Sequence, residues 1–290
     1  MTDKAIDPQR LINALDSMSA FSPAALKIID IANRINAEAA HLVEAVQKDP
    51  MLMAKVLKLV NSAYFGMRTP VSSLSRAVIL LGFNTIKNIA LSVALTSGMK
   101  VADSFRWFDN EAFWRHCLAC GLASKDLAHA QGVSLREADE YFVAGLLHDI
   151  GKVIILKEYA ADCAELYDPS YRPDTPKYRL EQERFGMDHA SLGGRMATSW
   201  KFPPSLAGAI AWHHEPLLAP DEARRLALTV HMANRTVHDR KIGIQADTNL
   251  GSIAGEIAAG FPLDDQAVAK AVTGLEEKVD EAKAFLTVER

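Results

Sequence analysis

Disulfide frameworks, membrane spans and basic surfaces all lack support in this 290-residue chain. Its three cysteines are too few to form a framework, and they indicate reduced thiols. No apolar run approaches the roughly 20 residues that cross a bilayer, and the polar first residues lack the apolar core of a signal peptide. The formal net charge of -4 disfavours nucleic acid or an anionic membrane as the main partner. We therefore expect a cytoplasmic protein.

Apolar sequence is abundant enough for a sizeable core, because 49% of the residues are hydrophobic. These residues recur at helical spacing, and no segment alternates with a period of two for long enough to require a strand. The sequence therefore predicts an all-α protein. Residues suited to cap helices precede the apolar stretches, namely Asp7, Ser22, Asp49, Ser73, Asn84, Asp109, Ser134 and Asp188. The helical periodicity lapses between Ser97 and Trp107, which indicates a boundary between two lobes.

Polar residues occur where an apolar helix is expected to end, at His148-Asp149 with Lys152 just beyond. Further histidines lie at His116, His189 and the pair His213-His214. Imidazole and carboxylate groups from several helices can together enclose iron, manganese or zinc. Any one of these histidines also fits a core residue that satisfies a hydrogen bond, and Lys152 alone fits a solvated lysine at a helix end.

As a set, these residues are better explained by a metal site, since buried polar groups need partners. Another potential ligand pair, Cys117 and Cys120, lies one helical turn apart. We interpret these two cysteines as small buried helix residues, because the chain has no second cysteine pair to complete a zinc site.

The order of these polar residues resembles that of the HD superfamily of metal-dependent phosphohydrolases. The segment from His148 to Lys152 and the double histidine look like the HD-GYP branch, which cleaves cyclic di-GMP, but Glu215-Pro216 follows where Gly-Tyr-Pro is expected. The HDOD domain is a better match, since the chain is similar to its ordered landmarks at Asp49–Gly66, Ile79–Gly82, Gly145–Lys152, Glu183–His189, Trp200–Pro203 and His213-His214.

This resemblance implies an all-helical, bacterial signalling domain over residues 10–215. A bundle of short helices at 10–105 is expected to pack on an HD-like lobe at 106–215, with a C-terminal helical extension at 216–290 packing on that lobe. The resemblance places metal ligands at His116, His148, Asp149, His189, His213 and His214. It also places Lys152 beside the phosphate of a substrate.

The closing aspartate of the hydrolases has no match, because Asn234 occupies the best candidate position. Its neutral amide leads us to expect at most a weakly bound or single divalent ion. The preferred function is a non-catalytic signalling module that binds a protein or a nucleotide second messenger. The alternative is a metal-dependent hydrolase of phosphomonoesters or cyclic dinucleotides.

A partner could contact Asn61, Tyr64 and Phe65. As structural residues, Asn61 would instead end a helix and the two aromatic rings would fill the core between the lobes. Trp107, Glu111 and Trp114, near the expected boundary between the lobes, are interpreted as structural.

Overall fold

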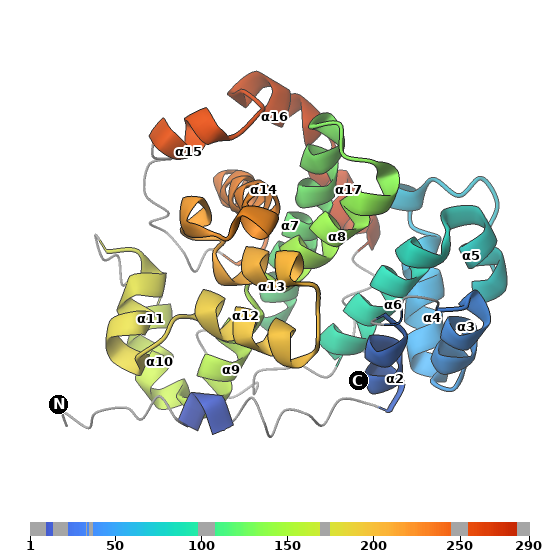
Figure 1. The fold of residues 1–290 in the computed structure, drawn as a ribbon, viewed down its shortest axis with the longest axis horizontal. Helices are drawn as coiled ribbons and strands as arrows, with labels where there is room; N and C mark the ends of the chain where they lie inside the picture. The colour runs from blue at the N-terminus through green and yellow to red at the C-terminus, as the bar shows by residue number, and fades with distance from the viewer. Residues whose placement is uncertain are drawn as a thin grey trace.

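The computed structural model describes residues 10–13, 23–32, 34, 37–97, 108–168, 175–244 and 255–282. All regular secondary structure in these ranges is helical, which confirms the all-α prediction (Figure 1). No helix in the same ranges is long and apolar enough to cross a membrane. The candidate caps Asp7 and Ser22, and also Trp107, lie outside the described residues.

The N-terminal bundle is built around α6. The other helices of this bundle all contact it. The elements are α2 (Pro23–Ala32), α3 (Ala39–Gln47), α4 (Pro50–Val60), the 3-10 turn η1 (Ala63–Phe65), α5 (Leu74–Leu81) and α6 (Phe83–Ser97). Asp49 and Ser73 cap α4 and α5 as predicted, because their side chains accept hydrogen bonds from the backbone amides of Leu52 and Arg76.

The predicted helix cap at Asn84 is wrong. Helix α6 already begins at Phe83, and the carbonyl of Gly82 accepts a helical hydrogen bond from the amide of Ile86 at 3.3 Å. Gly82 adopts a φ of 87°, so it ends α5 and starts α6 within a single residue. Asn84 therefore lies inside the first turn.

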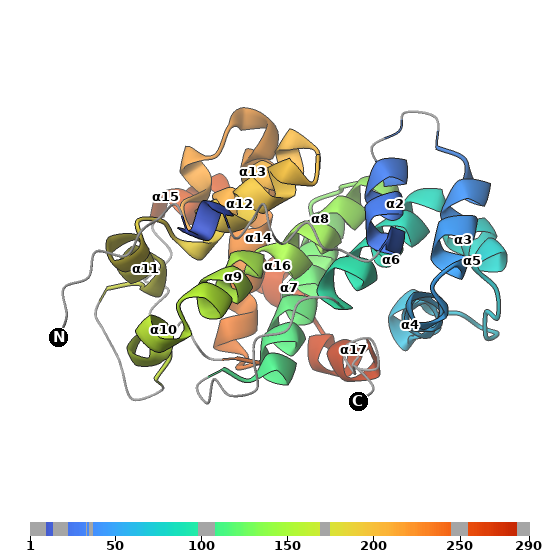
Figure 2. The same cartoon turned by 90° about the horizontal axis from the view of Figure 1, so that it is seen from below.

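The second lobe is built around α7, which α8, α14, α16 and α17 all contact. Its elements are α7 (Asn110–Ala130), α8 (Leu135–Leu147), α9 (Ile150–Glu158), α10 (Ala160–Tyr167), α11 (Lys177–Phe185), α12 (His189–Ser199), α13 (Pro204–Ala211), η2 (Pro216–Leu218), α14 (Asp221–Asp239), α15 (Gly255–Gly260), α16 (Asp265–Ala271) and α17 (Leu275–Ala282). Figures 1 and 2 show α7 in the middle of the molecule, between the N-terminal bundle and α14. Side chains in the middle of α7 are therefore shielded from solvent.

The two lobes meet where α6 packs on α8. Buried Asp139 on α8 accepts hydrogen bonds from Thr85 Oγ1 at 2.6 Å and from Lys125 Nζ at 2.7 Å. The same ammonium lies 5.5 Å from the ring centre of Tyr64 and 5.4 Å from that of Phe65. These two rings are half-buried, pack against the hydrophobic core and lie beside this cation, which supports the structural interpretation of them. Glu111 lies in the first turn of α7, and Trp114 is a buried residue of the same helix.

Helix α9 approaches α12 closely at Gly151. A Cβ atom at this position would lie 2.9 Å from the carbonyl carbon of His189 and 3.0 Å from the amide nitrogen of Gly193, both of which are backbone atoms.

We therefore expect Gly151→Ala to destabilise the protein by about 1–3 kcal/mol, because α9 and α12 must separate. The free energy of unfolding in urea would measure this loss. Gly255→Ala is the matched control, since a Cβ atom there would meet no other part of the protein within 4 Å. Equal stability of the two variants would contradict this account.

Candidate metal centre

The His148-Asp149 pair occupies the junction between α8 and α9. Helix α8 ends at Leu147 and α9 begins at Ile150, so both residues lie between two helices that continue the chain through the interior. Asp149 precedes α9 but makes no capping hydrogen bond with its side chain. Both side chains are fully buried. The carboxylate is thus available to groups from neighbouring helices.

The predicted histidines converge on Asp149. Its Oδ1 lies 3.1 Å from His189 Nε2, 3.5 Å from His148 Nε2 and 3.9 Å from His213 Nε2. Its Oδ2 lies 3.8 Å from His116 Nε2 and 2.8 Å from Lys152 Nζ. All of these side chains are at most 1% exposed. The convergence that the sequence predicted is confirmed, whereas metal ligation by these residues stays a prediction.

Backbone carbonyls orient two of the imidazoles. His148 Nδ1 lies 2.7 Å from the carbonyl of Gly145, and His213 Nδ1 lies 2.8 Å from that of Ile210. A carbonyl can only accept, so both Nδ1 atoms donate. Burial lowers the pKa of both histidines, so the rings are neutral and Nε2 carries a lone pair. Neither Nε2 has a hydrogen-bond partner among the described residues, and each is therefore presented as a metal ligand would be.

His189 is held differently, by a carboxylate that the sequence interpretation missed. Glu181 on α11 accepts hydrogen bonds from His189 Nδ1 at 2.5 Å and from the His189 amide at 2.9 Å. Burial acts to lower the pKa of His189, but the Glu181 carboxylate and the hydrogen bonds to Asp149 and Glu181 raise it to about 10. Glu181 stands in a run of charged residues typical of a solvated helix, so only its position eight residues before His189 signals its role.

The far side of the cluster contains Asn234 and Cys120. Asn234 on α14 is 3% exposed, and its Oδ1 lies 3.9 Å from Cys120 Sγ. Cys120 Sγ also lies 3.5 Å from His116 Nε2, one helical turn earlier on α7. The interpretation of Cys120 as a buried helix residue is right about its burial, but it missed the polar contacts. Burial raises the pKa of the Cys120 thiol well above its ordinary value, so the free side chain is a neutral thiol.

Lys152 departs from the expectation of a solvated lysine. It is 1% exposed, and its ammonium forms an ion pair with Asp149 Oδ2. The reason is local, because Lys152 lies one turn beyond Asp149 on α9, whose side chains from Ile150 to Leu156 are all buried. A charged lysine on such a helix requires a buried anion.

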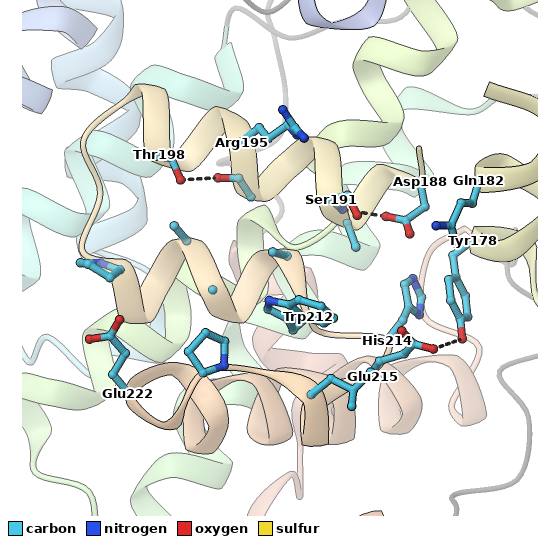
Figure 3. A pocket seen from close by; sticks show the side chains of 18 residues that line it. Tyr178, Gln182, Asp188, Ser191, Arg195, Thr198, Trp212, His214, Glu215 and Glu222 are labelled. Carbon is cyan, nitrogen blue, oxygen red and sulfur yellow. Dashed lines mark hydrogen bonds between the residues drawn. The ribbon is translucent and has the colours of Figure 1, made fainter. Parts of the chain in front are cut away.

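His214 connects the cluster to a surface cavity of about 750 Å³. Its Nε2 lies 2.9 Å from His189 Nε2, and its ring stacks on that of Tyr178, with centres 4.4 Å apart. Figure 3 shows the two stacked rings beside Glu215, which accepts a hydrogen bond from the Tyr178 hydroxyl. The charged residues that line this cavity are Asp188, Arg195, Glu215 and Glu222. Carboxylates therefore outnumber guanidinium groups.

The candidate partner residues at the end of α4 have structural contacts. Asn61 Oδ1 accepts a hydrogen bond from the Val71 amide at 2.7 Å, and Asn61 Nδ2 donates to the carbonyls of Val71 at 2.8 Å and Leu57 at 2.9 Å. These bonds close the loop between α4 and α5, which favours the structural interpretation of Asn61. A partner role for Asn61, Tyr64 and Phe65 stays a prediction.

Other proteins share the sequence pattern and the fold of this chain. An uncharacterized protein of Treponema pallidum is 29% identical over 214 residues, which are 73% of this chain and 41% of that protein, so the chain spans about two fifths of its relative. The fold matches a protein of Shewanella amazonensis whose name provisionally assigns it as a phosphohydrolase, with a TM-score of 0.76, 24% identity and coverage of 96% of this chain and 98% of that one.

It also matches an HDOD domain protein of Geobacter sulfurreducens, with a TM-score of 0.70, 22% identity and coverage of 96% and 97%. The sequence model of the HDOD domain family matches residues 18–216, well over half of the chain. The chain therefore belongs to the HDOD domain family.

Proposed function

We propose that this protein is a regulatory module whose buried histidine-aspartate cluster does not catalyse hydrolysis. The observation that carries the proposal is the burial of Asn234, which is 3% exposed and offers a neutral amide beside the cluster, at the candidate position of the closing aspartate. In a metal-dependent hydrolase, carboxylates neutralise the bound cations. Here the cluster lacks that second carboxylate, and Asp149 forms an ion pair with Lys152, 2.8 Å away.

The charges within the cluster balance without an added ion. Burial acts to raise the pKa of Asp149. The pKa is nevertheless held well below its usual range by His148, Lys152 and His189, so Asp149 is an anion. Glu181 is paired with His189, whose raised pKa keeps it protonated at neutral pH. Two carboxylates thus face two cations. Burial lowers the pKa values of the remaining imidazoles, His116, His148, His213 and His214, which are therefore neutral.

A pair of divalent cations would add four positive charges to this neutral, enclosed cluster. Such charges repel strongly at low dielectric unless carboxylates offset them. Asn234 provides an amide at the position where the hydrolases have their closing aspartate, and it adds no negative charge. Iron, manganese or zinc therefore fits here only as a single or weakly held ion, in keeping with a role other than hydrolysis.

For the partner, the cavity beside His214 favours a protein over a nucleotide. Its lining has three carboxylates and one guanidinium, and Figure 3 shows Arg195 extending from α12 away from Trp212. Phosphate groups would meet mainly negative charge there. A protein segment with basic side chains is the more favourable ligand.

The alternative, a metal-dependent phosphohydrolase, draws support from His148, Asp149 and His213, whose potential ligand atoms all lie within 4.8 Å of one another. A hydrolase would turn over cyclic dinucleotides or phosphomonoesters and would lose this activity in Asp149→Ala. We expect no turnover above background in the wild-type protein. Turnover that disappears in Asp149→Ala would overturn the regulatory proposal.

We expect Asn234→Asp to increase the metal occupancy of the purified protein, because it adds one negative charge beside His116 and Cys120. Elemental analysis of both proteins after dialysis against the same divalent ions would measure the change. The control is Gln47→Glu, which adds the same charge at an exposed position of the N-terminal bundle. If occupancy rises equally in the two variants, the effect of Asn234 is not local.

Removing one partner of the buried ion pair should be costly, whereas removing both should cost less. We expect Lys152→Met and Asp149→Asn each to destabilise the protein by about 3–5 kcal/mol, since each leaves one buried charge uncompensated. The double variant should lose less than the sum of the single variants, as measured by unfolding in urea. Saturating zinc should raise the melting temperature of Lys152→Met more than that of wild type, because the ion replaces the lost ammonium. Additive losses and equal shifts would contradict the proposed pairing.

A further inference from the structure

We propose that Cys120 is a metal ligand that, together with His116 and His148, binds a thiophilic divalent ion such as zinc. The inference deepens the proposed function by naming the chemistry of the ion. It rests on that function in one respect: the ion is bound without being used for hydrolysis. His116 Nε2, Cys120 Sγ and His148 Nε2 belong to fully buried residues whose potential ligand atoms lie within 4.8 Å of one another.

The spacing suits tetrahedral coordination. Zinc binds thiolate sulfur at about 2.3 Å and imidazole nitrogen at about 2.0–2.1 Å, which places the two ligand atoms about 3.5 Å apart in a tetrahedron. Cys120 Sγ and His116 Nε2 are separated by 3.5 Å. Both residues lie one turn apart on the central helix α7, so this separation does not depend on a loop.

A second observation points to a missing ligand. Nε2 of His148 has no hydrogen-bond partner among the described residues, although the side chain is fully buried. The bond from His148 Nδ1 to Gly145 commits the ring to the tautomer with a lone pair on Nε2. An unpaired buried lone pair is unfavourable. A cation between His148, His116 and Cys120 would satisfy it.

Cys120 also supplies the negative charge that Asn234 does not. When the ion binds, the S–H bond breaks, a metal–sulfur bond forms and the proton passes to solvent, with no change in oxidation state. The anionic ligand then comes from α7 in place of α14. Asn234 Oδ1, 3.9 Å from the sulfur, offers a neutral oxygen for a further coordination position. A donor set of sulfur and nitrogen selects zinc or cobalt over magnesium or calcium.

The chain provides a matched control in Cys117. It lies one turn earlier on α7 and is equally buried, but it belongs to none of the ligand clusters found among the described residues. Wild type, Cys120→Ala and Cys117→Ala would each be loaded with cobalt(II) and their absorption recorded. We expect a sulfur-to-cobalt charge-transfer band in the near ultraviolet for wild type and Cys117→Ala, and none for Cys120→Ala. Competition with a chelator should show zinc affinity at least about tenfold weaker in Cys120→Ala alone.

Cys120→Ser guards against a folding defect, because it preserves the side-chain volume but cannot give the thiolate band. Cobalt-loaded wild type without the band, a band that persists in Cys120→Ser, or failure of wild type to bind either ion would each overturn this inference. None of these outcomes affects the regulatory proposal. Hydrolysis that depends on Asp149 would overturn the regulatory proposal whether or not the thiolate band is seen.

Discussion

Enclosure of the Asp149 carboxylate is the constraint on which the rest of this structure depends. A buried anion is costly unless cations and dipoles surround it. Lys152 from α9 and His189 from α12 provide the cations, so the two helices must approach each other closely. Gly151 permits that approach, because its missing side chain leaves room for the backbone of α12. The position of α12 then determines where Glu181 on α11 is needed, since His189 requires its own anion.

Local signals in the sequence were sufficient for much of this fold. Asp109, Ser134 and Asp188 cap their helices as expected, because a cap depends only on the residues within one turn. The cap predicted at Asn84 was wrong because Gly82 ends one helix and starts the next. Only the backbone conformation of Gly82 shows this.

Convergence of the histidines on Asp149 could also be predicted, since polar residues in apolar helices need common partners. What the sequence could not reveal was the part that Glu181 and Cys120 take in this cluster. Glu181 stands among charged residues and Cys120 among apolar ones, so each looks ordinary in its own helix. Lys152 was interpreted as solvated because a single lysine near a helix end is usually exposed. The sequence did not show that α9 is buried on every side. Membership of the HDOD family accounts for the fold, whereas the chemistry of the cluster follows from these side chains individually.

The position of His214 has a thermodynamic consequence. Its ring contacts His189 of the buried cluster on one side and Tyr178 at the surface cavity on the other. A molecule that bound in the cavity and shifted Tyr178 would therefore alter the interaction free energy of His214 with the cluster. By linkage, an ion in the cluster that changed this interaction would change the affinity of the cavity by the same factor. Contact through one imidazole would in this way couple the two sites without a large conformational change.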